Sequence, residues 1–584
     1  MRESWAVALL SLALSACGSS SAPAPTPVAA NPSTAATPDR WPEFAARFIE
    51  GYLRANPYFA VQAGRHEFDG QMSDWSAGGI SAEVARLHAM RTEAASFDTA
   101  TLTEAERLER EIVLTVTDGS LFWLERTQSP FTNPAWYLEQ LDPEVYLNRG
   151  YAPLATRMRG YIGYLRAIPK LAADVRANLR TPLPPSFAQR GIDDFGGYVD
   201  FFRHDGPKVF AGVTDSAAQH ELAEASAAAA TAMARLKAWF EGERRHATGR
   251  FALGEPLFLE MLRSTERVEV PIAQLLEVGR ADLERNTQAL KAACAHYQPG
   301  GALQACVDRM RAHKPSGGPV EGARAQLEQL REFIVAKNIV RIPSDERPQV
   351  AEAPPYNRSN AAYINIPGPY EKGVAYTYEI APPDPSWSAK ERADYIPGKA
   401  TLLYTTVHEV WPGHFLQFLY SNRNPSKVAA LWVGYAYAEG WAHYCEEMMW
   451  EAGLGNGDTE QHIGQLTDAL LRNVRYLSAI GLHTRGMTLA ESDRMFRERA
   501  YTDPGNARQQ AARGTFDPEY LKYTLGKLMI RKLRADWVAR QPGAAASADP
   551  RQYWQDFHNR FLSYGGPPIP LVRKAMVGEG GSLF

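Results

Sequence analysis

The stretch 402–417, LLYTTVHEVWPGHFLQ, holds the residues with the clearest capacity for chemistry in this sequence. His408 stands directly before Glu409, and a second histidine, His414, follows six residues after the first. Two imidazoles and a carboxylate at short spacing are the materials of a catalytic zinc site, in which the metal activates a water and an unligated Glu takes its proton. The stretch therefore predicts a hydrolytic Zn²⁺ site, which we interpret as that of a zinc peptidase.

The spacing of the two histidines differs from the common pattern H-E-x-x-H, which puts both His on one helix face. In a regular helix, His414 would point well away from His408. Pro412 and Gly413 stand between them, and Pro disrupts a helix while Gly tolerates backbone angles that other residues avoid. Either a bulge or kink absorbs this insertion and returns His414 to the metal, or the helix stops at Trp411 and His414 belongs to the next element.

A second candidate segment lies at 434–453, GYAYAEGWAHYCEEMMWEAG. Glu439, His443 and Glu446 stand at i, i+4 and i+7, so they share one face of a helix whose other positions are largely apolar or aromatic. An acidic side chain in an apolar stretch is costly to bury unless it pairs or binds a metal. On spacing alone, each Glu is either a metal ligand or a partly exposed helix residue.

Together, HEVWPGHFLQ and AEGWAHYCEE resemble the HE-x-x-PGH…EGWA pattern of the bacterial family known as domain of unknown function 885, which is grouped with the gluzincin-type zinc peptidases. In gluzincins, the two His of the motif and a Glu farther along the chain bind zinc. The resemblance implies His408, His414 and Glu439 as the Zn²⁺ ligands and Glu409 as the general base. It covers nearly the whole mature chain, although only these two segments are specific.

The same resemblance suggests what the neighbours of the ligands do. Glu446, two turns beyond Glu439, would orient a ligand His, a role that metal sites usually need. His443 is a rival ligand by its spacing, but the family pattern usually has an apolar residue there, so we do not include it. The implied fold is mainly α-helical with a small β element, a gluzincin-like metallopeptidase fold with an elaborated helical N-terminal half.

A later helix, DALLRNVRYLSAIGLHTRG, carries further candidates. The family has a similar R-x-x-R…H segment, which here contains Arg472, Arg475 and His483. Family members often have an Asp four residues before the His, whereas this sequence has Ala479, which weakens a proton-shuttling role for His483. A lone His on a helix is more often structural. Arg475 could bind a substrate carboxylate through its planar fork, although a solvated or salt-bridged Arg is the default.

The segment FDPEYLKYTLGKLMIRKLR resembles the family's P-x-x-x-x-Y-x-x-G-[KQ] stretch. The match points to Tyr523 as the phenol that hydrogen-bonds an oxyanion, with Tyr520 on the same face as its rival. Either could instead be a core aromatic. In the implied mechanism, Glu409 deprotonates a zinc-activated water that attacks a peptide carbonyl, while Tyr523, together with His483, stabilises the oxyanion.

The N-terminus has the features of an export signal. Residues 1–16 carry Arg2 and then AVALLSLALSA, which predicts a bacterial signal peptide too short to span a bilayer permanently. LSAC at 14–17 resembles a lipobox, in which the cysteine, here Cys17, is lipidated; ordinary secretion would leave this Cys unexplained. Residues 17–39 are rich in Ser, Ala and Pro and predict a flexible tether. We expect a lipid anchor in the cell envelope, facing the periplasm or at the outer membrane.

The remaining chain divides by pattern. Residues 40–340 are helical almost throughout, with capping boxes expected at 103–106 and 216–219 and Pro271 in the first turn of a helix. Residues 341–584 form the zinc-binding part, and the two parts are expected to act as one unit. AAYINI (361–366) and VAYTYEI (374–380) alternate as strands do. A strand beside the metal helix would let a peptide add to the sheet edge, but a hairpin that only packs is about equally compatible.

Composition supports an ordinary globular protein, with 45% hydrophobic residues and a formal net charge of −3 that shows no bias toward nucleic acid. Of the four Cys, Cys294 and Cys306 are close enough to pair, and Cys445 is expected to be a buried small hydrophobe. The expected partner is a short peptide substrate, and the membrane is reached only through the lipid anchor. The alternatives are a metal-dependent amidase of other substrates and a non-catalytic peptide-binding or scaffolding lipoprotein.

Overall fold

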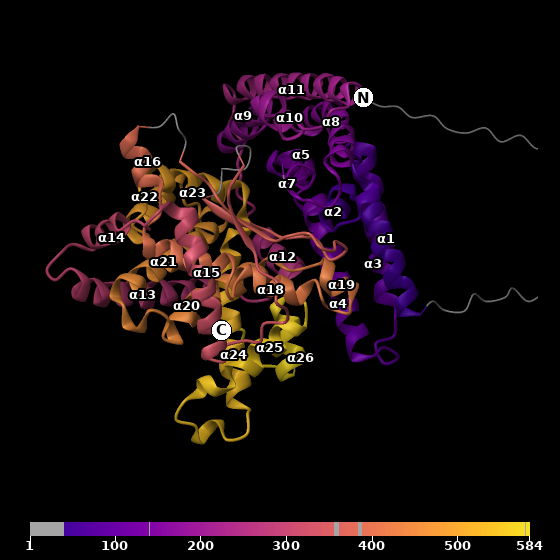
Figure 1. Cartoon of the computed structure of the whole chain (residues 1–584). Helices are drawn as coiled ribbons and strands as arrows, with labels where there is room; N and C mark the ends of the chain where they lie inside the picture. The colour runs from indigo at the N-terminus through magenta and orange to yellow at the C-terminus, as the bar shows by residue number, and fades with distance from the viewer. Residues whose placement is uncertain (1–39, 139, 355–360, 384–387, 579) are drawn as a thin grey trace, which may run out of the picture. The chain divides into compact units, whose positions relative to one another are not determined.

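The structure, a computed structural model, describes residues 40–138, 140–354, 361–383, 388–578 and 580–584, and nearly all of its elements are helices (Figure 1). The predicted signal peptide, Cys17 and the tether lie outside the described residues. Trp41–Phe584 forms a compact unit with its own contacts. Among the described residues, no helix is both long and apolar enough to cross a membrane.

The helices that precede the sheet agree with the helical pattern of residues 40–340. They are α1 Trp41–Ala55, α2 Pro57–Gln62, η1 His66–Phe68, α3 Ala77–Ser96, α4 Glu104–Leu121, η2 Phe122–Arg126, α5 Ser129–Thr132, α6 Ala135–Leu138, α7 Glu144–Asn148, α8 Leu154–Asn178, α9 Pro185–Asp200, η3 Phe201–Asp205, α10 Gly206–Val209, α11 Ser216–Arg244, α12 Glu255–Glu266, α13 Ile272–Tyr297, α14 Leu303–Ala312 and α15 Gly318–Ala336. Within this set, α11 packs along α8 and α9 (Figure 1).

Helix starts follow local capping chemistry, with one correction. The predicted capping box of α4 is present, because Thr103 and Glu106 exchange side chain to backbone hydrogen bonds. The box predicted at 216–219 is wrong. Asp215 caps α11 by accepting from the N–H groups of the next residues, so Ser216 is already helical. Pro271 occupies the N-cap of α13, one position before the first turn.

A three-stranded sheet follows, made of β1 Gln349–Glu352, β2 Ala362–Asn365 and β3 Thr377–Ile380. The strand order is β1-β3-β2, with β3 parallel to β1 and antiparallel to β2. The two predicted strands are β2 and β3, both shorter than their sequence patterns. The sequence analysis did not identify β1, because four residues in a Pro-rich stretch give little alternation. Tyr378 of β3 is buried, with its hydroxyl 3.5 Å from the Thr406 hydroxyl, so the sheet lies beside the helix that carries His408.

The helices after the sheet carry all the predicted catalytic and metal-binding residues. They are α16 Ala389–Tyr395, α17 Lys399–Glu409, α18 His414–Ser421, α19 Lys427–Leu431, α20 Tyr435–Glu451, η4 Leu454–Gly457, α21 Thr459–Thr484, α22 Leu489–Arg499, α23 Pro504–Phe516, η5 Pro518–Leu521, α24 Lys522–Ala539, η6 Ala544–Ala546, η7 Pro550–Tyr553, α25 Trp554–Ser563 and α26 Ile569–Val577.

The largest hydrophobic core joins α12 to α15, the sheet and most later helices, so it spans both parts of the chain. Helix α21 packs along α13 and α17, and α20 packs along α24. Helices α20 and α24 approach closely at Gly440 and Gly526: a Cβ on Gly440 would lie 2.5 Å from the Gly526 Cα. Side chains larger than hydrogen would separate these helices, which carry Glu439 and Tyr523.

Buried polar contacts also tie the first helices to the sheet. The Arg149 guanidinium donates to the Asn365 side chain of β2 at 3.0 Å and to the Gln62 carbonyl of α2 at 3.0 Å. Asn148 donates to Glu379 of β3 at 3.3 Å. The helical part before the sheet therefore shares both polar and apolar contacts with the part that carries the candidate site.

Candidate metal centre

The chain between His408 and His414 is a sharp break between two helices. Helix α17 ends at Glu409, the Trp411–Pro412 bond is cis, and α18 begins at His414. A Cβ on Gly413 would lie 1.7 Å from the His408 carbonyl oxygen, so only glycine lets the chain fold back against the last turn of α17. Both sequence alternatives are partly right: the helix stops before Trp411, and His414 nevertheless returns beside His408.

The two histidines converge with Glu439 of α20. Nε2 of His408 and Nε2 of His414 lie 3.3 Å and 3.4 Å from Oε2 of Glu439. One ligand atom from each residue lies within 4.8 Å of the others, and no other group of His, Cys, Asp or Glu within the described ranges meets this condition. The structure thus brings the three predicted ligands together.

The donor set fits a zinc ion. Two imidazole nitrogens and one carboxylate oxygen are the ligand types of catalytic zinc sites, which keep a further position open. Oε2 of Glu439 and Nδ1 of His414 are enclosed and have no hydrogen-bond partner among the described residues. Because an unsatisfied buried carboxylate oxygen is costly, a cation bound at this point would remove a real penalty.

Glu446 holds the imidazole of His408 from behind. Its Oε1 lies 2.6 Å from Nδ1 of His408, and its Oε2 lies 3.1 Å from Nδ1 of His443. Arg472 of α21 pairs with the same carboxylate at 3.0 Å. A carboxylate only accepts, so Nδ1 of His408 carries a hydrogen, which leaves Nε2 as the nitrogen that can bind a metal. The orienting contact expected of Glu446 is therefore present.

The charges around the cluster favour a cation. Burial opposes protonation of His408, but the nearby carboxylates of Glu439 and Glu446 outweigh it and raise its pKa to about 9. Burial also opposes ionisation of Glu439, yet His414 and His408 hold the pKa of this carboxyl well below its usual range. Burial raises the pKa of Glu409, the residue expected to act as base. A base with a raised pKa takes up a proton more readily at neutral pH.

The structure separates the two candidate tyrosines. The Tyr523 ring stacks 6.3 Å from the His408 ring and meets the Tyr435 ring edge-on at 5.8 Å. Tyr520 is fully buried, and a Cβ on Gly514 would lie 2.3 Å from its hydroxyl, so it is enclosed by α23. Tyr523 is therefore the phenol beside the three candidate metal ligands, and Tyr520 is a core aromatic.

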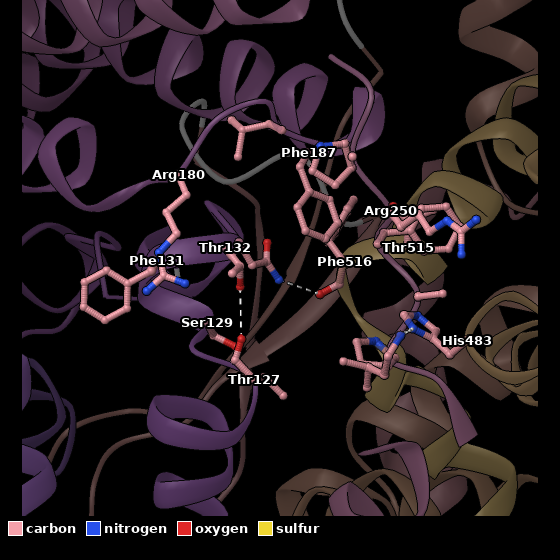
Figure 2. Close-up of a pocket in the computed structure, with 18 of the residues that line it drawn as sticks. Thr127, Ser129, Phe131, Thr132, Arg180, Phe187, Arg250, His483, Thr515 and Phe516 are labelled. Atoms are coloured by element: carbon pink, nitrogen blue, oxygen red, sulfur yellow. Dashed lines mark hydrogen bonds between the residues drawn. The ribbon is translucent and has the colours of Figure 1, made fainter. Parts of the chain in front are cut away.

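His483 lies in a different environment from the cluster. Its Nε2 donates to the Gly514 carbonyl at 2.8 Å, and its Nδ1 accepts from the Leu253 N–H at 3.3 Å. Burial lowers its pKa to about 4. The ring forms part of the wall of a cavity of about 340 Å³, together with Phe187, Phe516 and other residues (Figure 2). Both ring nitrogens are used by the main chain, so the structure gives His483 a structural contact and does not bring it to His408.

His443 and the cysteines also have defined places. His443 is fully buried beside Glu446, its Nε2 has no described partner, and it stands outside the three-residue cluster. Cys294 and Cys306 form a disulfide between α13 and α14. Cys445 is buried, as expected, with its Sγ 3.7 Å from the Pro412 carbonyl. The Trp441 indole donates to the same carbonyl at 2.9 Å, which helps to hold the helix break.

Sequence analysis missed a buried charge network behind the site. Asp282 pairs with Lys527 at 2.6 Å, and Glu447 pairs with Arg285 at 2.9 Å and with Lys527 at 3.3 Å. The network links α13 to α20 and α24, the helices that carry Glu439 and Tyr523. The available signal was Lys527 itself, a lysine within the apolar run LGKLMI, which is rarely buried without a partner.

Comparison with known proteins gives the family but no activity. No curated protein matches the chain. A solved candidate lipoprotein of unknown function from Shewanella oneidensis is similar with a TM-score of 0.76 at 22% identity, covering 92% of this chain and 100% of that one. A candidate lipoprotein from Colwellia psychrerythraea is similar with a TM-score of 0.76 at 17% identity, covering 92% and 98%. Residues 57–576 match the model described as bacterial protein of unknown function (DUF885). The chain therefore belongs to the DUF885 family.

Proposed function

We propose that this protein is a zinc-dependent peptidase with a gluzincin-like site. The observation that carries the proposal is the convergence of His408, His414 and Glu439 from three helices, next to a Glu409 that is not one of the three donors. A zinc site with a purely structural role needs no such base, whereas a hydrolytic site does. The two similar solved structures leave the activity open, since their identity to this chain supports the fold alone.

Each site residue has a defined task in this proposal. His408, His414 and Glu439 would hold Zn²⁺, which when bound lowers the pKa of a water and polarises a carbonyl. Glu409 takes a proton from the attacking water as its oxygen bonds to the peptide carbonyl carbon. Glu409 then gives this proton to the leaving amine as the C–N bond breaks. The Tyr523 phenol donates a hydrogen bond to the developing oxyanion.

We propose short peptides as substrates. The side chains of His408, His414 and Glu439 are only 6%, 12% and 19% exposed, so the site is recessed. An extended peptide can enter such a site more easily than the surface of a folded protein. We also propose that the mature chain is anchored in the cell envelope by lipidated Cys17, consistent with the description of both similar solved proteins as candidate lipoproteins.

A mixed peptide library, incubated with the soluble form lacking residues 1–39 and analysed by mass spectrometry, tests the activity. The zinc-loaded parent is expected to cleave peptides, and Glu409→Gln to cleave them about 10²- to 10⁴-fold more slowly with zinc content unchanged. Glu451→Gln, on the same helix as Glu439 but paired with Arg534, serves as the control and keeps parent activity. Zinc binding without cleavage of any peptide, or undiminished cleavage by Glu409→Gln, would contradict the proposal.

A further inference from the structure

Three arginines lie against the rings of Tyr523 and Tyr520, and one of the three has no carboxylate partner. Arg472 pairs with Glu446 at 3.0 Å, and Arg513 pairs with Asp517 at 2.8 Å. The third, Arg475, donates from Nε to the neutral amide oxygen of Gln510 at 2.8 Å. No Asp or Glu of the described residues lies within salt-bridge distance of Arg475. Its positive charge is therefore not paired with a carboxylate, unlike the charges of Arg472 and Arg513.

The surroundings of Arg475 make an unpaired charge costly. Burial lowers its pKa, and the positive charges of Arg513 and Arg472 lower it further. Its planar group lies 5.1 Å from the centre of the Tyr523 ring, which offers weaker compensation than a carboxylate. The described residues accept no hydrogen bond from Nη1 or Nη2 of Arg475, so both nitrogens keep N–H groups that can donate to a ligand. A planar fork in this state is suited to binding a carboxylate with two parallel hydrogen bonds.

The distance from Arg475 to the three candidate metal ligands limits how far the bound carboxylate can lie from the peptide bond that is cut. Tyr523 is close to both: its ring is 6.3 Å from the His408 ring and 5.1 Å from the guanidinium carbon of Arg475. The guanidinium and His408 can therefore be no farther apart than these two distances together. Extended peptide covers about 3.3–3.6 Å per residue, so the two distances together correspond to the length of about three residues. A carboxylate on Arg475 and a peptide bond at the three candidate ligands would therefore be separated by only a few residues.

We infer that Arg475 binds the C-terminal carboxylate of a peptide substrate, which makes the proposed peptidase a carboxy-terminal exopeptidase that releases one to a few residues. The inference rests on the proposed function for the cleavage step, whereas carboxylate binding by Arg475 stands without it. An acidic side chain near the end of a peptide offers the same chemistry, so the test separates the two sources.

The test uses two pools of N-acetylated hexapeptides of mixed sequence, one with free C-terminal carboxylates and one with C-terminal amides. Both are passed over immobilised Glu409→Gln protein, with and without zinc, and retained peptides are counted by mass spectrometry. The free-acid pool is expected to be retained about 10-fold or more over the amide pool. Adding Arg475→Gln removes this preference, whereas Arg508→Gln, an exposed arginine on the same helix as Gln510, leaves it intact.

Equal retention of both pools, or a preference that survives Arg475→Gln, would overturn the inference. A third outcome is that amidated peptides are retained through Arg475 only when they contain Asp or Glu. Arg475 would then bind an acidic side chain, and the inference that it binds the chain terminus would be wrong. The zinc-loaded parent is then given both pools. Cleavage of internal bonds at equal rates in acids and amides refutes the exopeptidase assignment while leaving a peptidase. Acid-selective retention with no cleavage keeps the Arg475 site and refutes the peptidase.

Discussion

Nδ1 of His408 lies 2.6 Å from Oε1 of Glu446, a fully buried carboxylate that also holds His443 and Arg472. The contact fixes the hydrogen of His408 on Nδ1 and directs Nε2 toward His414 and Glu439. A carboxylate seven residues beyond Glu439 on α20 thus orients the imidazole of a candidate ligand on α17.

Replacing Glu446 is expected to weaken zinc binding without removing any ligand. Glu446→Gln places an amide where His408 needs an acceptor, and we expect an affinity for zinc about 10- to 100-fold lower. Glu447→Gln is the matched control, because this neighbouring buried Glu binds Lys527 and Arg285 instead of the cluster. Competition with a zinc chelator measures both. Parent affinity in Glu446→Gln would contradict the role given to this residue.

The return of His414 to the cluster predicts the metal content of the purified protein. The parent is expected to carry about one zinc per chain and His414→Ala much less, because only two donors remain. His443→Gln removes a buried His outside the cluster and should keep its zinc. Elemental analysis after dialysis decides this. Full zinc retention by His414→Ala would mean that another ligand, with His443 the first suspect, completes the site.

Gly413 is expected to tolerate no side chain. A Cβ there would meet the His408 carbonyl oxygen at 1.7 Å, and backbone cannot move aside as a flexible side chain can. We expect Gly413→Ala to lower the free energy of unfolding by about 1–3 kcal/mol and to reduce zinc occupancy. Gly197→Ala, an exposed helical position where a Cβ meets nothing within 4 Å, should be neutral or slightly stabilising in the same urea titration. Equal effects of the two changes would show that the close approach is unimportant.

His66 predicts a pH-dependent contribution to stability far from the cluster in sequence. Burial lowers its pKa, but Asp69 and Glu371 outweigh this effect and raise the pKa from 6.5 to about 9. A raised pKa stabilises the fold fully below pH 6.5, and this stabilisation is lost as pH rises through about 9. His66→Gln should therefore lower the free energy of unfolding by up to about 3 kcal/mol at low pH, with the difference vanishing above the folded-state pKa.

Urea unfolding at about pH 6 and about pH 10 checks the His66 prediction. His88→Gln removes an exposed His–Glu125 pair and should change little at either pH, as exposed ion pairs contribute about 0–1 kcal/mol. A His66→Gln penalty that is the same at both pH values would place the effect in the stacking of the ring on Tyr151, 3.5 Å away, and not in its charge.

The disulfide between Cys294 and Cys306 closes a short loop between α13 and α14, with a sequence separation of 12. Replacing both cysteines by Ser is expected to lower the free energy of unfolding by about 2–3 kcal/mol, mainly because the unfolded chain gains freedom. A reductant should destabilise the parent by a similar amount and leave the double Ser variant unchanged. The absence of any reductant effect on the parent would show that the bond is not formed in solution.

The sequence alone was sufficient for features that depend on residues close together in the chain. Helical periodicity predicted a mainly helical protein, the Thr103–Glu106 capping box marked the start of α4, and alternation located β2 and β3. The pattern of His408, Glu409 and His414 located the candidate site only together with the AEGWAHYCEE segment and the family resemblance, because a short motif alone has many chance matches. Predictions that depended on weak local signals were wrong. The strand β1 was missed because it has only four residues, and the N-cap of α11 is Asp215 where Ser216 was predicted.

Only the tertiary structure decided how these residues meet. His414 returns to His408 because Gly413 lets the backbone contact the end of α17. In addition, Trp441 of α20, far from this segment in sequence, donates a hydrogen bond to the Pro412 carbonyl. Helices α20 and α24 pack closely together. In this packing Tyr523 lies beside His408, whereas Tyr520 is buried in the core. The hydrogen bonds of His483 to the main chain likewise depend on segments far apart in sequence. So does the environment of Arg475, whose neighbours include Gln510 but no described carboxylate. Such contacts follow from the packing of whole helices, which local spacing does not determine.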